Sequence, residues 1–382
     1  MKIIADENIP FVDEGFGQLG DVVLKAGRAI TADDVRDAVM LIVRSVTKVN
    51  AELLDGSSVK FVGTCTIGTD HIDLDYLGGR GIGFAAAPGS NATSVAEYIV
   101  AVMLQLGERM GFRLAEKTLG IIGVGNVGSR VETRARALGM NVLLNDPPLA
   151  RETLKPKYLA LDDVLARADI VTLHVPLTDE GTDATHHMVD EEFIDKMKDG
   201  AILLNSSRGG VHETATLLHA KVTGKLGGLY LDVWEDEPAI DVDLLRATDV
   251  ASPHICGYSA DGKVAGVMMI HRAACASLGQ SSDWDPSEQL PAPMLAETHL
   301  ESCEKLTDDT LRELVLATYD FTGDDRRLRD IAGLPPDERA RQFDLLRKNY
   351  PCRREFANTR VKCSNCSPDV RDALAAVGFT VV

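Results

Sequence analysis

The sequence predicts an α/β fold with two doubly wound parallel sheets and a small C-terminal α+β domain. Three observations predict it. Short apolar segments alternate with helical segments through roughly the first 280 residues, which is the rhythm of parallel sheets covered by helices. A glycine triplet spaced Gly-x-Gly-x-x-Gly lies at 123–128, well inside the chain. A linker at 281–292, with Pro286 and Pro291, then separates a last block of about ninety residues.

The first predicted unit begins at the N-terminus. Its expected strands, separated by polar or glycine turns, are Ile3–Ala5, Val39–Val43, Val59–Val62 and Ile82–Phe84. Because the glycine triplet arrives only near residue 120, this first sheet is expected to be separate from the second. A helix over about 93–106 should carry the chain to the second unit. A helical stretch from His254 to about Leu278 should return it.

The second predicted unit holds five strands, and the last block holds helices with short strands. The five strands are Leu119–Ile122, Val142–Asn145, Ile170–Leu173, Ala201–Asn205 and Leu226–Asp232. In the last block, helices are expected at 308–318, 336–349 and 368–376, and strands at 356–362 and 378–382. The predicted domains are therefore 1–92 with 258–280, then 93–257, then 281–382, with a ligand cleft between the first two.

The glycine triplet predicts a site for a dinucleotide. Gly123 allows a tight turn, Gly125 lacks a Cβ that would strike a pyrophosphate, and Gly128 lets the following helix pack closely on the strand. The amides at the helix start then face the anion. Asp146 ends the next strand, where a ribose 2′-hydroxyl needs an acceptor, so NAD is favoured over NADP. The predicted cofactor contacts here are Gly123, Gly125, Asn126, Val127, Gly128 and Asp146.

Composition narrows the class of protein. The chain has 382 residues, 45% of them apolar, and a net charge of −18, which argues against binding nucleic acid or anionic membranes. It shows neither an apolar run of membrane-spanning length nor a signal-peptide start, and its seven scattered cysteines favour reduced thiols in the cytoplasm. Cys363-x-x-Cys366 is the only close pair, and with no second pair nearby no metal site is predicted.

Three further motifs each follow a predicted strand of the second sheet. They are Asn205-Ser-Ser-Arg-Gly-Gly210, Asp232-Val-Trp-Glu-Asp-Glu-Pro238 and Ser252-Pro-His-Ile-Cys-Gly-Tyr258. Ligands bind beyond the carboxyl ends of parallel strands, so Arg208, Glu237 and His254 are expected to line one crevice. Such a set suits oxidation of a 2-hydroxy acid. The arginine would hold the carboxylate, the histidine would take the hydroxyl proton, and the acid would orient the imidazole.

Together these motifs resemble those of the D-2-hydroxyacid dehydrogenase superfamily. Longer matches sharpen the resemblance to its erythronate-4-phosphate dehydrogenase family: Val43-Arg-Ser-Val-Thr-Lys-Val-Asn50, Gly68-Thr-Asp-His-Ile-Asp73, Asn145-Asp-Pro-Pro148 and Leu346-Arg-Lys-Asn-Tyr350. The similarity covers essentially the whole chain. It implies NAD-dependent oxidation of 4-phospho-D-erythronate to 2-oxo-3-hydroxy-4-phosphobutanoate in pyridoxal 5′-phosphate biosynthesis. It also implies that 1–92 with 258–280 binds substrate, that 93–257 binds NAD, and that 281–382 forms a homodimer.

The resemblance also implies roles for single residues. Arg208 and Glu237 become active-site residues, and His254 the proton donor and acceptor. The further NAD contacts it implies are Val175, Ser206, Asp232 and Gly257, beside Asp146. The substrate contacts it implies are Ser45, Thr66, Gly68 and Tyr258.

The substrate phosphate needs cations beyond Arg208, because the protein as a whole is acidic. Arg44 and Ser45 follow the strand Val39–Val43, at the end expected to face the cleft. A second basic region, residues 339–362, holds eight basic residues against only Asp344 and Glu355. We therefore expect Arg44 and Ser45 to bind the phosphate and Arg347 to reach it from the C-terminal block. The sequence leaves open whether Arg347 does so within one chain or across a dimer.

Two alternatives remain at this point. One is another D-2-hydroxyacid dehydrogenase, such as a 3-phosphoglycerate dehydrogenase, whose substrate is one carbon shorter. The other, from a different class, is an NAD-sensing binding protein on the same scaffold, like the C-terminal binding protein corepressors. Turnover of the phosphorylated acid separates an enzyme from a sensor, and a substrate panel separates the two enzymes.

Overall fold

A computed structural model describes residues 1–301 and 303–382 of the chain. These residues form two compact units. The first unit is Met1–Asn91 with Ser259–Pro291, and the second is Ala92–Tyr258 with Ala292–Val382. The C-terminal block thus belongs to the same unit as the second sheet. The division into three domains, 1–92 with 258–280, 93–257 and 281–382, stays a prediction.

The first unit is built on a five-stranded parallel sheet in the order β2-β1-β3-β4-β5. Its strands are β1 (Lys2–Asp6), β2 (Asp21–Lys25), β3 (Met40–Val43), β4 (Phe61–Thr64) and β5 (Gly83–Ala85). The sequence did not predict β2, which is an edge strand whose residues are only partly buried or exposed, so it lacks the apolar run of a central strand.

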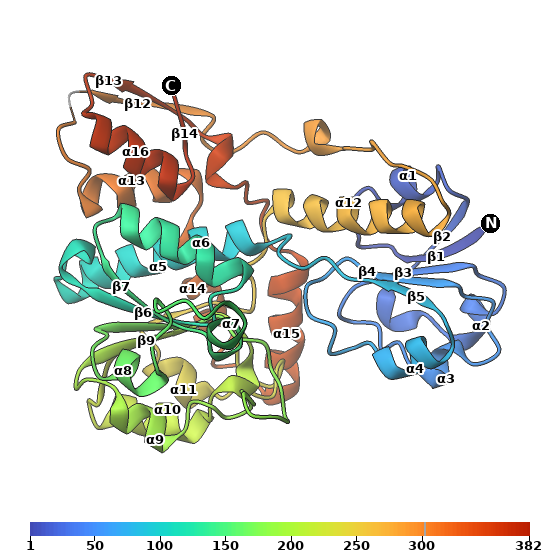
Figure 1. Cartoon of the computed structure of the whole chain (residues 1–382), viewed down its shortest axis with the longest axis horizontal. Helices are drawn as coiled ribbons and strands as arrows, with labels where there is room; N and C mark the ends of the chain where they lie inside the picture. The colour runs from blue at the N-terminus through green and yellow to red at the C-terminus, as the bar shows by residue number, and fades with distance from the viewer. Residues whose placement is uncertain (302) are drawn as a thin grey trace. The chain divides into compact units, whose positions relative to one another are not determined.

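Helices cover both faces of this first sheet (Figure 1). The long α12 (Ala260–Ser277) lies along one face. On the other lie three short helices, α2 (Ala32–Val35), α3 (Ala51–Leu54) and α4 (Leu74–Gly79). A further short helix, α1 (Val12–Phe16), packs on α12. The segment 281–292, predicted to be a linker, contributes the buried Trp284 to the α12 side of this core.

The second unit is built on a six-stranded parallel sheet in the order β11-β10-β9-β8-β6-β7. Its strands are β6 (Thr118–Ile122), β7 (Asn141–Asn145), β8 (Ile170–Leu173), β9 (Ala201–Asn205), β10 (Leu226–Leu231) and β11 (Val250–Ala251). The two-residue β11 is too short to show a period in the sequence. Because every pairing is parallel, all six carboxyl ends meet at one edge, and each predicted motif follows one of them.

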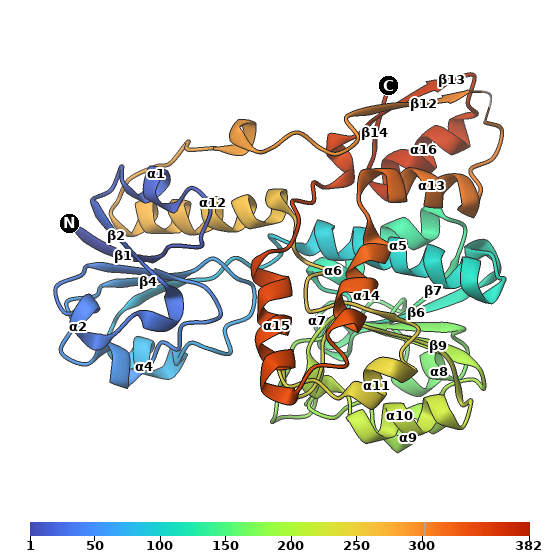
Figure 2. The ribbon, with the colours of Figure 1, turned by 180° about the vertical axis from the view of Figure 1, so that it is seen from behind.

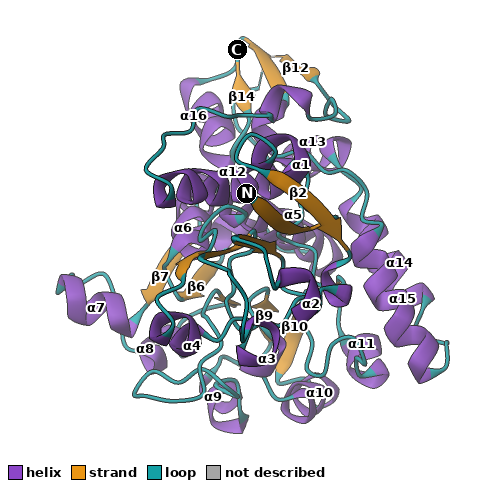
Figure 3. Ribbon diagram, turned by 90° about the vertical axis from the view of Figure 1, so that its right-hand side faces the viewer, coloured by secondary structure: helices purple, strands orange, loops and turns teal. Residues whose placement is uncertain are grey.

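Two layers of helices enclose this second sheet (Figures 1 and 3). One layer holds α5 (Ala92–Met110) and α6 (Asn126–Ala137). The other holds α8 (Leu161–Leu165), α9 (Glu191–Lys196), α10 (Thr214–Val222) and α11 (Val242–Ala247), and α7 (Pro147–Thr153) follows β7. Fifteen residues of α5 are buried, as expected of a helix covered on all sides.

The C-terminal block supplies the other cover of α5. It holds a three-stranded parallel sheet of β12 (Glu297–Glu301), β13 (Arg360–Ser364) and β14 (Thr380–Val381). Its helices are α13 (Asp308–Thr318), α14 (Phe321–Asp330), α15 (Pro336–Lys348) and α16 (Pro368–Val377). Figure 2 shows α14 and α15 beside the second sheet. Of these elements the sequence did not predict β12 or α14, both rich in charged residues.

One hydrophobic core joins this block to the second sheet. Apolar residues of α13 and α16, such as Leu311 and Leu374, belong to the same cluster as Tyr98 of α5 and Val131 of α6. The α/β class is therefore confirmed, with two Rossmann-like sheets and a small third sheet. The C-terminal block is positioned against the second sheet and its helices by buried apolar surface, the dominant favourable term in folding.

Candidate active site

The glycine loop after β6 has the geometry that a dinucleotide requires. Gly123 has a φ of +86°, and a Cβ there would lie 2.6 Å from the carbonyl oxygen of His174. A Cβ at Gly128 would lie 2.0 Å from the oxygen of Gly123, so only glycine allows α6 to approach β6 this closely. At Gly125 a Cβ would meet nothing within 4 Å. That open space at the start of α6 fits the pyrophosphate of NAD.

Asp146 holds this loop as well as standing where a ribose is expected. Its Oδ2 accepts a hydrogen bond from the amide of Val124 at 2.8 Å, and its Oδ1 accepts one from Leu149 at 2.9 Å, which caps α7. An ionised carboxylate has about four acceptor positions, so these two bonds leave room for a hydroxyl. The predicted cofactor contact and the local structure therefore use the same side chain.

His174 links the ends of β8 and β9. Its Nε2 lies 3.0 Å from the hydroxyl of Thr172, and its Nδ1 lies 3.5 Å from that of Ser206. Burial lowers the pKa of His174 to about 3, so the ring is neutral near pH 7. Val175 follows it directly and is half-buried. These contacts position the two predicted cofactor residues Val175 and Ser206 beside the glycine loop.

Asn205, at the end of β9, shapes the loop that carries Arg208. Its side-chain oxygen accepts from the amide and the hydroxyl of Ser207, at 3.0 and 2.7 Å, and its Nδ2 donates to the carbonyl of Arg208 at 3.0 Å. The guanidinium of Arg208 donates to the carbonyl of Ser207 at 2.8 Å. The same Asn205 amide donates to Nδ1 of buried His212 at 3.0 Å.

Asp232, at the end of β10, is fully buried and holds the segment that carries His254. Its backbone oxygen accepts from the amide of His254 at 2.7 Å. Its carboxylate accepts from the amide of Ile255 at 2.8 Å and from the hydroxyl of Ser252 at 2.6 Å. These bonds hold His254 at a φ of +57°, a conformation that side-chain-bearing residues rarely adopt. Backbone strain at a residue predicted to be catalytic is consistent with that prediction.

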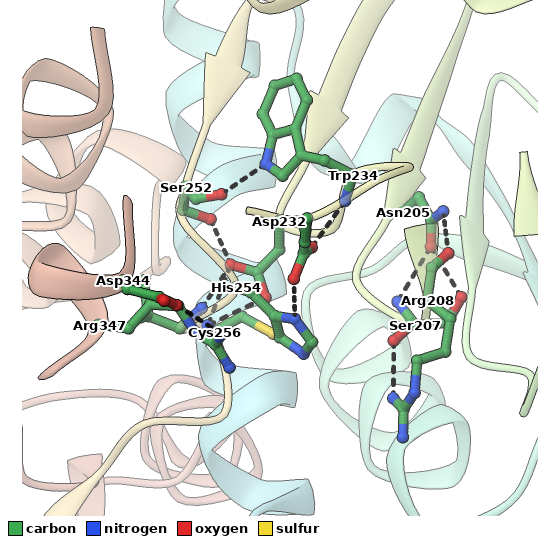
Figure 4. A network of polar contacts seen from close by, with 12 residues as sticks. Asn205, Ser207, Arg208, Asp232, Trp234, Ser252, His254, Cys256, Asp344 and Arg347 are labelled. Atoms are coloured by element: carbon green, nitrogen blue, oxygen red, sulfur yellow. Dashed lines mark hydrogen bonds and ion pairs between the residues drawn. The ribbon is translucent and has the colours of Figure 1, made fainter. Parts of the chain in front are cut away.

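Glu237 and His254 form a hydrogen-bonded pair (Figure 4). Nδ1 of His254 lies 2.8 Å from Oε2 of Glu237, and Oε1 of Glu237 accepts from the amide of Trp234 at 2.8 Å. An ionised carboxylate can only accept, so Nδ1 carries the proton and Nε2 is left as the basic atom of the neutral ring. The His254 side chain is 32% exposed, which gives a ligand access to it.

The surroundings of Glu237 keep it ionised. Burial alone would raise its pKa, but the charge and hydrogen bond of His254, the charge of Arg347 and the amide of Trp234 outweigh it. The pKa of Glu237 therefore lies below its ordinary value. This arrangement suits an acid that orients a histidine without competing with it for the proton.

Arg347, from α15 of the C-terminal block, lies in the same unit as the histidine pair. Its Nη2 donates to the hydroxyl of Tyr258 at 3.4 Å, and its Nη1 lies 3.9 Å from Oδ1 of Asp344. Figure 4 shows Arg347 near His254, with Arg208 on a separate loop. The structure thus brings Arg347 to the predicted site within one chain. Gly257, a predicted cofactor contact, lies between His254 and Tyr258 in the sequence.

The remaining predicted substrate contacts all belong to the first unit. Arg44 follows β3, and its guanidinium binds the fully buried Asp6 through two hydrogen bonds, at 2.9 and 3.3 Å. Ser45 is exposed beside it. The hydroxyl of Thr66, after β4, lies 2.7 Å from that of Thr64 and 3.4 Å from the carbonyl of Gly68.

Sequence reasoning missed several residues that organise these sites. Asp6 was overlooked as the partner of Arg44, although an acid at the carboxyl end of an apolar strand was a usable signal. Ser252 and Trp234 connect the loops after β10 and β11, since the indole donates to the carbonyl of Ser252 at 3.1 Å. Arg353, which binds the carbonyl of Cys256, gave no sequence signal, because it is one basic residue among eight in 339–362.

The described residues form neither a metal-binding cluster nor a membrane-spanning helix. Among residues 1–301 and 303–382, no group of three or more His, Cys, Asp or Glu side chains could hold a metal ion. Within the same residues, none of the helices has both the length and the apolar character needed to span a membrane.

Comparisons with known proteins agree with the geometry. The family model described as D-isomer specific 2-hydroxyacid dehydrogenase, NAD binding domain, matches residues 95–256. A model described as a domain of unknown function (DUF3410) matches residues 289–378. The solved structure of D-lactate dehydrogenase from Aquifex aeolicus, complexed with NAD and lactic acid, is 31% identical with a TM-score of 0.62. The match covers 73% of this chain and 96% of that one.

Curated relatives match over nearly the full length. Erythronate-4-phosphate dehydrogenase of Salinibacter ruber is 48% identical over 362 residues, which is 93% of this chain and 92% of the relative. Its namesake in Proteus mirabilis is 42% identical over 379 residues, 99% of both chains. The expected cofactor, NAD, is confirmed by the family model and by the open glycine loop that fits it. The chain belongs to the erythronate-4-phosphate dehydrogenases, a family of NAD-dependent oxidoreductases among the D-isomer-specific 2-hydroxyacid dehydrogenases.

Proposed function

We propose that this protein oxidises 4-phospho-D-erythronate to 2-oxo-3-hydroxy-4-phosphobutanoate with NAD, as a step of pyridoxal 5′-phosphate biosynthesis. The observation that carries the proposal is the Glu237–His254 pair, which leaves a basic Nε2 on a ring that ligands can reach. The names of the relatives supply the substrate. The family supplies the class of reaction, which is oxidation of a 2-hydroxy acid. That reaction needs one base at the hydroxyl and one cation at the carboxylate.

In the proposed mechanism, His254 acts on the 2-hydroxyl and Arg208 binds the neighbouring carboxylate. Nε2 of His254 takes the proton of the 2-hydroxyl while Nδ1 keeps its bond to Glu237. Ionised Glu237 stabilises the imidazolium that forms. The guanidinium of Arg208 binds the carboxylate and the developing carbonyl oxygen, and Asn205 fixes the loop that presents it. NAD, when bound, supplies the acceptor for the hydride that leaves the second carbon.

NAD would be held by residues at the carboxyl edge of the second sheet. In the proposal the pyrophosphate would be held by Gly123, Gly125 and the first amides of α6, which include Asn126 and Val127. Asp146 would accept a hydrogen bond from the ribose. Four further residues contact the rest of the cofactor: Val175, Ser206, Asp232 and Gly257. Support for this placement comes from the open space at Gly125 and from the position of each residue after a strand end.

The substrate phosphate is proposed to meet cations at the end away from Arg208. Arg347 is a candidate because its Nε has no hydrogen-bond partner among the described residues, and because it lies close to the pair that performs the chemistry. Arg44 and Ser45 remain candidates from the first unit, with Thr66 and Gly68 beside the same strand ends. Tyr258 would contact the substrate next to Arg347.

Three features of the proposal concern the whole protein. Residues 1–92 with 258–280 would form the substrate-binding domain, and residues 93–257 the NAD-binding domain. Residues 281–382 would build a homodimer. The protein would act in the cytoplasm, without nucleic-acid or membrane partners, as the charge of −18 and the odd number of cysteines favour.

A substrate panel followed by NADH absorbance tests the proposal. The panel contains 4-phospho-D-erythronate, unphosphorylated D-erythronate, 3-phosphoglycerate and D-lactate. We expect the highest kcat/KM for 4-phospho-D-erythronate. A higher value for 3-phosphoglycerate would favour the shorter substrate, and binding of NAD without turnover of any acid would favour the sensor class. Either of these results would contradict the proposed function.

A further inference from the structure

Residues 254–258, called here the histidine segment, carry His254 at one end and Tyr258 at the other. Its amides are held from one side by Asp232, whose carboxylate accepts from Ile255 and Cys256 at 2.8 and 3.2 Å. Because a carbonyl and the next amide share one rigid plane, these bonds fix the peptide planes up to Cys256 but leave the carbonyls of Cys256 and Tyr258 to other partners. What binds the carbonyls therefore matters for the direction in which His254 and Tyr258 point.

A single guanidinium holds two carbonyls of the histidine segment, those of Cys256 and Tyr258. Nη2 of Arg353 donates to the carbonyl of Cys256 at 2.7 Å, and its Nε donates to that of Tyr258 at 3.2 Å. Nη1 and Nη2 both lie 3.3 Å from the carbonyl of Ser94, near the start of α5. Arg353 belongs to the C-terminal block, between α15 and β13.

The side chain of Arg353 is built into the core rather than resting on the surface. It is only 1% exposed, and its guanidinium lies 5.5 Å from the ring centre of Tyr98 and 5.6 Å from that of Phe321. The Glu97 carboxylate, 4.0 Å from Nη1, supplies a nearby acid. Because burying a charge without partners is costly, the buried guanidinium of Arg353 depends on the carbonyls to which it donates.

The carbonyls that Arg353 binds lie near both ends of the stretch Ala92–Tyr258. The chain enters the second unit at Ala92 and leaves it at Tyr258. Arg353 binds Ser94, just after the entry, and Tyr258, at the exit. One side chain of the C-terminal block therefore fixes both points, together with the segment that carries the proton-transferring histidine.

We propose that Arg353 is a positioning residue of the dehydrogenase, which sets the orientation of His254 and Tyr258 through the backbone of the histidine segment. The C-terminal block is then part of the active-site frame in every single chain, whatever its role in assembly. This inference rests on the proposed function for its kinetic test, because His254 must be the group that moves the proton.

A purely structural role, docking the C-terminal block, is the alternative, and the chain contains a matched control for it. Arg329 of α14 also belongs to this block and also donates to three carbonyls, those of Leu245, Thr248 and Asp249, at 3.0, 2.7 and 3.4 Å. These carbonyls precede β11, and none of the predicted site residues lies among them. Removing Arg329 therefore weakens the docking of the C-terminal block, while the hydrogen bonds from Arg353 to the histidine segment remain.

The experiment compares Arg353→Met, Arg353→Lys and Arg329→Met in the full-length protein. For Arg353→Met we expect kcat to fall about 10–100-fold, the effect of a displacement of about 1 Å at the reacting groups. The dissociation constant of NAD should change much less than kcat, because Gly257 is the one proposed NAD contact that lies between the two carbonyls held by Arg353. The kcat of Arg353→Lys should lie between those of the parent and Arg353→Met, since an ammonium lacks the planar fork that reaches three carbonyls. Arg329→Met should lower Tm but leave kcat near the parent value.

A second readout needs no substrate. The ¹⁵N signals of the His254 imidazole, assigned through their loss in His254→Gln, report the hydrogen bond from Nδ1 to Glu237. We expect Arg353→Met to shift these signals and Arg329→Met to leave them in place. If Arg353→Met fails to fold, Arg353→Lys is measured in its stead.

Two results would overturn the inference. One is an equal loss of kcat in the Arg353 and Arg329 variants, which would mean docking alone. The other is unchanged His254 signals in both Arg353 variants. If the parent protein turns over none of the acids in the panel, the proposed function fails. The His254 signals still decide whether Arg353 positions the ring.

Discussion

Asp6 binds Arg44 through two hydrogen bonds, from Nε to Oδ2 at 2.9 Å and from Nη2 to Oδ1 at 3.3 Å. Asp6 is fully buried, so Arg44 is its counter-ion as well as a candidate for the substrate phosphate. Without Arg44 the Asp6 carboxylate would keep its hydrogen bonds from Asn8, so the loss should stay below the about 3–5 kcal/mol of breaking a fully buried pair. A simple truncation of Arg44 would therefore mix a stability effect with a binding effect.

We predict that Arg44→Ala is destabilised by less than about 3–5 kcal/mol, since Asn8 still donates to Asp6. The double variant Asp6→Asn with Arg44→Gln should recover much of this loss, because it buries no lone charge. Urea unfolding measures both. If Arg44 reads the phosphate, the double variant should still show a KM for 4-phospho-D-erythronate raised about 10–150-fold, while the KM for NAD is unchanged. Equal weakening of phosphorylated and unphosphorylated erythronate would show that Arg44 does not read the phosphate.

Arg347→Ala tests the second candidate cation. Its contacts are weaker than those of Arg44, at 3.4 Å to Tyr258 and 3.9 Å to Asp344, so its loss should affect stability less. A charge-assisted hydrogen bond to the phosphate predicts a KM raised about 10–150-fold for the phosphorylated substrate only. Arg341→Ala is the control, since its side chain on the same helix is exposed and pairs with Glu338. Equal effects of the two variants would indicate general electrostatic attraction rather than contact.

Replacing His254 by Gln should lower kcat by about 10²–10⁴-fold while NAD still binds, because general acid–base catalysis contributes on this scale. His187→Gln is a matched control, since it also removes an imidazole bound to a carboxylate, that of Glu235 at 2.7 Å. Stopped-flow kinetics and a fluorescence titration of NADH measure the two effects. A near-parent kcat for His254→Gln across the pH range would remove this histidine from the mechanism.

Asp146→Ser should relax the preference for NAD over NADP. Serine can still cap α7 through the amide of Leu149. The variant loses the carboxylate, which repels a 2′-phosphate and accepts a hydrogen bond from a 2′-hydroxyl. The ratio of kcat/KM for the two cofactors should move toward NADP. Asp190→Ser, a change at the cap of α9, should not move it. An unmoved ratio in Asp146→Ser would assign cofactor choice to another residue.

The buried histidine beside the Arg208 loop predicts an acid limit to stability. Burial lowers the pKa of His212 to about 4, from about 6.5 in an unfolded chain. Below pH 6.5 the unfolded state therefore binds more protons, and folding stability falls as the pH drops from about 6.5 to 4. Each pKa unit corresponds to 1.36 kcal/mol, so His212 should account for about 3 kcal/mol of this loss.

Unfolding free energies measured by urea between pH 7 and pH 4 test this limit. His212→Gln should remove about 3 kcal/mol of the pH dependence, whatever its stability at pH 7. His219→Gln, at an exposed position of α10, should leave the dependence as in the parent. If His212→Gln retains the full dependence, other groups, such as His174 with its pKa of about 3, are responsible.

The local sequence determined the parts of this protein that local chemistry controls. The spacing of apolar residues located the central strands, and β8 and β9 have the predicted bounds, because a strand buried on both faces reads as a continuous apolar run. The glycine triplet and the motifs around Arg208, Glu237 and His254 could be recognised because each is contiguous. The elements that escaped, such as β2 and α14, are charged or partly exposed and carry no such run.

Tertiary structure alone decided which distant residues meet. The position of Asp6 at a strand end hints at a site but does not name Arg44, 38 residues away, as its partner. No pattern in the chain indicates that Arg353 binds carbonyls 97 and 95 positions earlier. Nor does it indicate that Arg347 lies beside the Glu237–His254 pair of the same chain. The reason is physical: a buried charge takes its partners from whichever backbone or side-chain groups packing brings within reach. That packing is set by apolar residues spread over the chain, such as Tyr98 and Phe321, whose common core the local sequence does not encode.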